Sequence, residues 1–218
     1  MTFSLIGRCA RTGQFGAVAA GAAMATGARV AFCAAGIGAA LTQHRTDPRL
    51  GPAALALLAQ GMDAAGVVRQ LMDNNPEARW RQIAVLDRTG QGAVFSGART
   101  RPEMSEAAGP NVCAIGNLLA SARVPAAMRV AFDADPALPL PERLVRALEE
   151  GLAAGGDMMP LHSAHLLVVD QAPFPVIDLR IDWHDEPVTE LRALWERFAP
   201  LAPVFLQRAL DPDNAPFL

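Results

Sequence analysis

Alternating hydrophobic and polar residues at the start of the chain predict that it opens with β-strands. Phe3 and Leu5 alternate with the polar Thr2 and Ser4, as in a strand that buries one face. The tetrapeptide Arg11–Gln14 (Arg-Thr-Gly-Gln) then has the composition of a hairpin turn. The same kind of pattern continues to about residue 42. It predicts four consecutive strands, over residues 3–9, 15–23, 30–34 and 37–42.

The hydrophobic period then changes to that of helices. Asp47-Pro48 is typical of a helix start, and Gly61 of a helix end. Asp63 is expected to cap a second helix, which ends before Pro76. The remaining chain is predicted to form strands over 80–86, 93–96 and 111–115, helices over 118–132 and 144–152, strands over 165–170 and 176–182, and a helix over 187–198.

This order of elements predicts the fold class. Antiparallel hairpins interrupted by pairs of helices differ from the regular strand–helix alternation of a parallel sheet. They fit an α+β protein in which two stacked antiparallel sheets lie between helical layers, a four-layer αββα sandwich. We expect one such domain over residues 1–199, followed by a proline-rich tail over 200–218.

Composition narrows the function classes. The chain has 218 residues, of which 51% are hydrophobic, enough for one well-packed domain of roughly 200 residues. Its net charge is −3 and its 19 basic residues, all arginine, are scattered. We therefore expect neither a nucleic-acid partner nor a membrane-binding face. The stretch 15–43 is rich in alanine and glycine, and we interpret it as buried strands rather than a membrane span.

Cysteine and histidine positions indicate no disulfide framework, cofactor or metal. Three cysteines stand far apart without a CxxC pair, which favours reduced thiols and a cytoplasmic location. His162 and His165 would point to opposite faces of a strand, and His184 stands where polar capping residues are expected. We expect no metal site and no cofactor.

The second residue carries the candidate chemistry. Removal of Met1, which is usual before a small residue, would leave Thr2 with both a hydroxyl and a free α-amine. Such a residue holds a nucleophile and its own base. The alternative is that the chain starts Met-Thr for no chemical reason. Catalysis of this kind requires the free amine of Thr2, whereas a binding protein tolerates Met1.

Several residues are candidates for the groups around such a nucleophile. Developing negative charge on a substrate oxygen needs hydrogen-bond donors. Asn117, in Gly-Asn after a predicted strand, is the preferred donor, and its alternative is an ordinary turn residue. Thr42 and Gln43, at the end of another predicted strand, offer further donors for substrate binding.

The chain also resembles a known family. The segments that carry the resemblance are 2–8, 12–16, 36–43, 116–119, 155–157 (Gly-Gly-Asp) and 177–182. Together they resemble the bacterial DUF1028 family over nearly the whole chain, to about residue 198. The resemblance implies a fold similar to that of the N-terminal nucleophile hydrolases. The family itself is functionally uncharacterised, so the resemblance implies no substrate.

The resemblance adds three candidate residues. Asp157 is expected to orient the amine of Thr2, as acidic residues near this position do in proteasome-type proteins, and its alternative is a loop residue that caps backbone amides. Proteasome-type sites also use a lysine beside the nucleophile. This chain has no lysine, so Arg8 or Arg29 would have to supply the positive charge.

Two functions therefore remain open. The first is hydrolysis of a small amide or another C–N bond, with Thr2 as the nucleophile. The second is a non-catalytic protein of the same fold that binds a small molecule or a partner. In both cases we expect a homo-oligomer with a small-molecule substrate or ligand. The fold alone does not decide between them.

Overall fold

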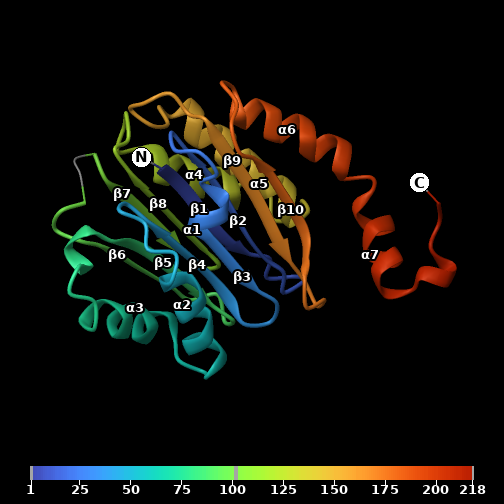
Figure 1. Cartoon of the computed structure of the whole chain (residues 1–218), viewed down its shortest axis with the longest axis horizontal. Helices are drawn as coiled ribbons and strands as arrows, with labels where there is room; N and C mark the ends of the chain where they lie inside the picture. Colours follow the sequence, from blue (N-terminus) through green and yellow to red (C-terminus); the bar gives the residue numbers. More distant parts are fainter. Residues whose placement is uncertain (1, 101–102, 218) are drawn as a thin grey trace.

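The computed structural model describes residues 2–100 and 103–217, and Figure 1 shows two stacked sheets with helices outside them. Met1, on whose removal the Thr2 hypothesis depends, lies outside the described residues. The strands are β1 (Thr2–Arg8), β2 (Phe15–Gly21), β3 (Ala31–Ala34), β4 (Gly38–Gln43), β5 (Gln82–Asp87), β6 (Gly92–Ser96), β7 (Ser105–Gly109), β8 (Val112–Asn117), β9 (Ser163–Val169) and β10 (Pro175–Ile181). The helices are α1 (Gly27–Val30), α2 (Leu50–Ala59), α3 (Ala64–Asp73), η1 (Ala78–Trp80), α4 (Val124–Asp133), α5 (Leu140–Ala153), α6 (Pro187–Phe198), α7 (Ala202–Leu210) and η2 (Pro212–Asn214).

Strand β1 lies in the middle of the larger sheet. The strand order in that sheet is β10-β9-β2-β1-β8-β7, and each neighbouring pair is antiparallel. The smaller sheet has the order β3-β4-β5-β6, also antiparallel throughout. Because β1 has a partner on each side, its first residue is held between two other strands.

Three hydrophobic clusters hold the layers together. Phe3 and Leu5 point from β1 to the cluster beneath α4, α5 and α6, whereas Ile6 points to the cluster between the two sheets. A third cluster packs α2 and α3 on the outer face of the smaller sheet. Successive side chains of a strand alternate between its faces, which explains how β1 serves two clusters at once. The predicted four-layer αββα sandwich is confirmed.

Most helices and strands occur where the sequence pattern predicts them. The helix predicted over 187–198 has the bounds of α6, and the Asp63 side chain caps α3 by accepting a hydrogen bond from the backbone N–H of Gly66 at 2.7 Å. Three interpretations were wrong. Helix α1 forms within the stretch 15–43, which was interpreted as strands, no strand was predicted where β7 forms, and the helix predicted over 118–132 begins only at Val124.

The last residues form a helix of their own. Helix α7 lies within the segment interpreted as a proline-rich tail, and none of its residues is buried. Phe205 of α7 stacks on Phe198 of α6 with ring centroids 5.5 Å apart, which attaches this segment to the domain. The division at residues 199 and 200 stays a prediction. Within the described residues, no helix has the length and apolar character needed to cross a bilayer.

Candidate functional site

Thr2 lies between two strands at one end of the larger sheet. It pairs with Gly21 of β2 on one side and with Asn117 of β8 on the other. The alternation of β1 places its side chain on the same face as those of Ser4 and Ile6, which is the face toward the smaller sheet. Thr2 is 7% exposed and Asn117 is fully buried. The structure therefore brings two of the expected catalytic residues together as direct neighbours.

A network of buried amide side chains links the two sheets beneath Thr2. Gln43 accepts a hydrogen bond from the Ser4 hydroxyl at 2.7 Å, and its Nε2 donates to the Thr2 carbonyl at 3.3 Å. Gln43 Nε2 also donates to Oε1 of Gln82 at 2.7 Å, and Asn117 Nδ2 donates to the same oxygen at 3.0 Å. We call these residues the amide network: Ser4, Gln43, Gln82 and Asn117.

Full burial makes this network unusual. All four side chains of the amide network have 0% exposure. Nε2 of Gln82 donates to the Gly116 carbonyl at 3.0 Å and to Ser96 Oγ at 3.1 Å, so both ends of that amide are used. Satisfied polar networks in a low-dielectric interior are rigid, because any rearrangement leaves a donor or acceptor without a partner. The network therefore fixes the positions of Asn117 and of the Thr2 backbone.

Asp157 lies just beyond the start of β1. It forms an isolated antiparallel bridge with Leu119, two residues beyond the Thr2 partner Asn117. Burial raises the pKa of its carboxyl above the usual value, although the backbone N–H groups of Met159 and Ala22 act in the opposite direction. Ala22 follows Gly21, the other partner of Thr2. The carboxyl thus lies between the continuations of both strands that flank β1.

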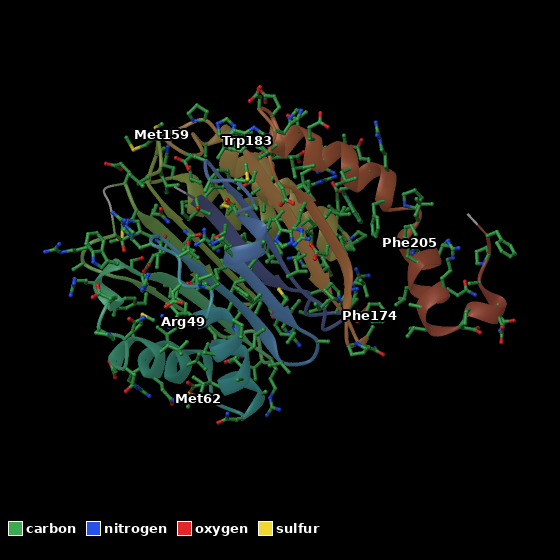
Figure 2. The ribbon with its side chains drawn as sticks, in the orientation of Figure 1. Arg49, Met62, Met159, Phe174, Trp183 and Phe205 are labelled. Atoms are coloured by element: carbon green, nitrogen blue, oxygen red, sulfur yellow. The ribbon has the colours of Figure 1, made fainter. Side chains whose placement is uncertain are left out.

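The two carboxyl oxygens of Asp157 differ in their contacts. Oδ1 accepts a hydrogen bond from the backbone N–H of Met159 at 3.0 Å. Oδ2 is buried and accepts no hydrogen bond from the described part of the chain. Asp157 also lines a cavity of about 460 Å³ together with Met159 and Asp185. Figure 2 shows Met159 at the same end of the molecule as Trp183, near the N-terminal end marked in Figure 1.

The other expected residues are not all brought to Thr2. Arg8 is six residues further along β1, roughly 20 Å away at the usual rise of a strand, and its guanidinium donates to Asn111 Oδ1 at 3.0 Å. Thr42 points to the outer face of its strand and donates to the Asp47 carbonyl at 3.4 Å. Arg29 is exposed on α1. Of the four residues expected to bind substrate, Gln43 alone joins the amide network.

Positive charge at this end of the sandwich comes from other arginines. The Cζ atoms of Arg45 and Arg99 each lie 5.3 Å from the centroid of the Trp80 ring. Arg81 donates to the Arg45 carbonyl and forms an ion pair of 3.8 Å with Asp47. Arg45 follows the end of β4, Arg81 precedes β5 and Arg99 follows β6. All three therefore lie at the strand ends that carry Gln43, Gln82 and Ser96. The face of the Trp80 ring attracts the guanidinium groups of Arg45 and Arg99.

Backbone strain concentrates at the same end. Six non-glycine residues in the described chain have positive φ angles. Five of them occur in loops at the Thr2 end: Ala25, His44, Arg45, Glu103 and Leu118. His44 and Arg45 directly follow Gln43, and Leu118 directly follows Asn117. Such conformations cost free energy and gather at functional sites, where surrounding contacts hold them. Most of the non-glycine residues with positive φ in the described chain therefore lie in loops around Thr2.

Sequence reasoning missed Ser4 and Gln82 as members of the site. A signal was present, because Gln43 and Gln82 are polar residues in otherwise apolar strand segments. In the structure these two glutamines stand directly opposite each other in the β4–β5 register. Two amides on neighbouring strands, in a predicted sheet buried on both faces, indicate a shared polar network.

These features define a class of protein. The chain is a four-layer αββα sandwich of two antiparallel sheets, with a hydroxyl-bearing residue at the start of its central strand and a buried amide network beside it. The model of DUF1028, a family of unknown function, matches residues 2–191. The chain therefore belongs to the DUF1028 family. No curated protein matches the sequence.

A solved structure from the same family agrees with this assignment. A crystal structure of a Silicibacter pomeroyi protein of the same DUF1028 family is 28% identical to this chain, with a TM-score of 0.84 over 91% of this chain and 89% of that chain. Anbu (ancestral beta-subunit) from Yersinia bercovieri is 10% identical, with a TM-score of 0.42 over 99% of each chain. A similarity that low is no evidence of a shared function.

Proposed function

We propose that this protein, once Met1 is removed, is a hydrolase that cleaves a small amide or another C–N bond with Thr2 as its nucleophile. The observation that carries the proposal is the pairing of Thr2 with Asn117 on the face between the sheets, while Asp157 lies beyond the start of the strand. The proposal includes the cytoplasmic location and the homo-oligomer expected from the sequence.

Each residue has a defined part in the proposed reaction. The Thr2 hydroxyl attacks the substrate carbonyl carbon and gives its proton to the α-amine. The buried carboxyl of Asp157 orients that amine and stabilises it when it is protonated, through the oxygen that accepts no hydrogen bond from the described chain. The side-chain amide of Asn117 donates to the developing oxyanion, and Gln82 and Gln43 hold Asn117 and Thr2 in place.

The proposed reaction has two steps, formation and hydrolysis of an ester on Thr2. In the first step the C–N bond breaks, the leaving amine takes the proton from the α-ammonium of Thr2, and an ester forms on the Thr2 oxygen. In the second step water attacks that ester, with the α-amine as base. The acid product then leaves and the Thr2 hydroxyl is restored. Asp157 and the amide network form and break no covalent bond in either step.

The test compares three residues at position 2. Thr2→Ser keeps a hydroxyl and an amine, Thr2→Ala keeps only the amine, and both replacements are small enough for removal of Met1. Each protein is assayed against a panel of small amides, with amine release as the readout. We expect the native protein and Thr2→Ser to release amine and Thr2→Ala to be at least 10²-fold slower. Equal release by Thr2→Ala and native protein would show that Thr2 is not the nucleophile.

Asp157→Asn separates catalysis from folding in the same assay. The substitution keeps the acceptor for the Met159 N–H but removes the charge that would hold the amine. We expect amine release to fall while the urea midpoint changes little, because the side chain keeps its size and its hydrogen bond with the Met159 N–H. If none of the panel is hydrolysed by protein that lacks Met1, the non-catalytic binding protein becomes the better account.

A further inference from the structure

A second candidate site lies at the end of β1 opposite Thr2. A cavity of about 460 Å³ opens where the loop after β1 meets the β7–β8 turn and the α4–α5 connection. We call it the arginine cavity. The polar residues that line it are Arg8, Cys9, Arg11, Asn111, Asp133 and Arg143. Its volume is within the range of pockets that bind small organic molecules.

Arg143 is the unusual member of this set. The residue is 6% exposed, and its guanidinium lies flat against Phe132, with Cζ 3.9 Å from the ring centroid. Nε donates to the Phe132 carbonyl at 2.9 Å. Arg143 forms no ion pair with any carboxylate of the described chain. Arginine is rarely buried to this degree without a partner of opposite charge.

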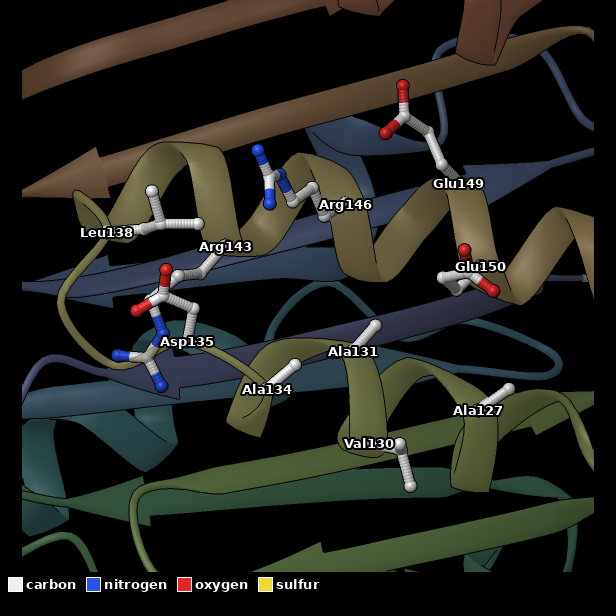
Figure 3. Close-up of a pocket in the computed structure, with 10 residues that line it drawn as sticks. All are labelled: Ala127, Val130, Ala131, Ala134, Asp135, Leu138, Arg143, Arg146, Glu149 and Glu150. Carbon is white, nitrogen blue, oxygen red and sulfur yellow. The ribbon is translucent and has the colours of Figure 1, made fainter.

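The nearby carboxylates do not neutralise it. Burial lowers the pKa of Arg143, and the charges of Cys9, Asp133 and Asp135 act against that shift, the two carboxylates without ion-pair contact. Asp133 instead pairs with Arg129 at 3.2 Å. Figure 3 shows Arg143 leaving α5 beside Asp135, at the opposite end of the α4–α5 groove from Glu149 and Glu150.

Arg11 is a second arginine that lines the same cavity. It donates through Nη2 to the Ala137 carbonyl at 3.0 Å. Arg8 also lines the cavity, but its guanidinium donates to Asn111 Oδ1 at 3.0 Å, and strand alternation places its side chain on the face of β1 toward the smaller sheet. Neither Arg8 nor Arg11 forms an ion pair with a carboxylate of the described residues. Arg11 and Arg143 therefore share the cavity with one carboxylate, that of Asp133, which is already paired.

We propose that the arginine cavity binds the phosphate group of a small molecule, with Arg11 and Arg143 as its ligands. Guanidinium groups bind phosphate oxygens through parallel N–H donors, and a buried guanidinium without a counter-ion gains most from such a ligand. Two guanidinium groups suit the charge of a phosphate monoester, which is close to −2, better than the single charge of a carboxylate. The cavity is large enough to hold an organic group beside the phosphate. The proposal is independent of the chemistry at Thr2.

Calorimetric titration of the full-length protein tests the proposal. The probes are inorganic phosphate, phenyl phosphate and, as the carboxylate comparison, benzoate, all at matched ionic strength. We expect phenyl phosphate to bind, inorganic phosphate to bind at least as well as benzoate, and both phosphates to stabilise the protein against heat. Tighter binding of phenyl phosphate than of inorganic phosphate identifies an esterified ligand, and equal binding identifies the free ion. Binding of benzoate more tightly than either phosphate would overturn the phosphate assignment.

Matched variants locate the binding. Arg11→Gln removes an exposed guanidinium, and we expect it to weaken phosphate binding by about tenfold. Arg143→Lys keeps the charge but loses the planar fork, and we expect a similar or larger loss. The control is Arg69→Gln, which removes an exposed arginine on α3, on the other side of the sandwich. Equal affinities in Arg11→Gln, Arg69→Gln and native protein, or no phosphate binding by native protein, would overturn the proposal.

Discussion

Replacement of Gln82 by leucine should show how much the amide network contributes to stability. The two side chains are similar in size, so the change removes polar atoms with little change of volume. It removes four hydrogen bonds, of which those with Gln43, Asn117 and the Gly116 carbonyl are buried. With about 1–2 kcal/mol for each buried bond whose partner stays in the interior, the loss is about 3–6 kcal/mol.

Part of that loss is offset. A fully buried leucine side chain contributes about 1–2 kcal/mol more than the polar one through burial of apolar surface. We therefore expect Gln82→Leu to lower the free energy of unfolding by about 2–4 kcal/mol, a large part of the ~5–15 kcal/mol that stabilises an ordinary domain. A loss of this size would show that the network stabilises the fold while it holds Asn117 and the Thr2 backbone in place.

Urea unfolding, followed by far-ultraviolet circular dichroism, measures this quantity. Gln70→Leu is the matched control, because Gln70 is exposed on α3 and the same chemical change there should alter stability by no more than about 0.5 kcal/mol. The reasoning would be refuted if Gln82→Leu lost less than about 1 kcal/mol, or no more than Gln70→Leu. Either result would mean that the amides of the network form no mutually dependent set.

Two further predictions concern the layers around the site. Asp87 accepts hydrogen bonds from Thr89 and from the backbone of Gln91 and Ala64, and although burial raises the pKa of its carboxyl, these bonds bring it below the usual 3.8. Its stabilising effect is therefore complete above pH 3.8 and is lost as the pH falls through the lowered pKa. Between pH 5 and 2.5, the free energy of unfolding should therefore fall less steeply in Asp87→Asn than in the native protein. Parallel curves for the two proteins would contradict this. Arg192 of α6 forms ion pairs with two residues of α5, Glu142 at 2.8 Å and Glu149 at 2.7 Å. Arg192→Met should therefore lower the free energy of unfolding by about 1–2 kcal/mol, whereas the control Arg197→Met, at an exposed position of α6, should not. Equal losses in the two variants would disprove the role of these ion pairs.

The fold was predictable because strand alternation and helix caps are local signals. The opening alternation around Phe3 and Leu5 gave β1, and Asp63 marked the start of α3. Strand β7 was missed because Ser105–Gly109 is short, lies at a sheet edge and has no large apolar side chain to alternate. Its place in the sheet comes from pairing with β8, which is not a local property of the sequence.

The site was predictable in part. Thr2 was found because removal of Met1 would expose it, and Asn117 because it follows a predicted strand; antiparallel pairing makes them neighbours. Arg8 was expected near Thr2 because the chain has no lysine to supply a positive charge, but an extended strand places it at the other end of the sheet. Gln82 requires the register between β4 and β5, which no spacing in the sequence gives.

The central claim is that Thr2 acts as the first residue of the working protein. The measurement that tests it most directly is the intact mass of the protein purified from its native host. The account predicts a mass that lacks Met1, with a free α-amine on Thr2 beside Asp157. A mass that retains Met1 in the whole population would contradict a self-activated Thr2, and would favour the non-catalytic binding protein of the same fold.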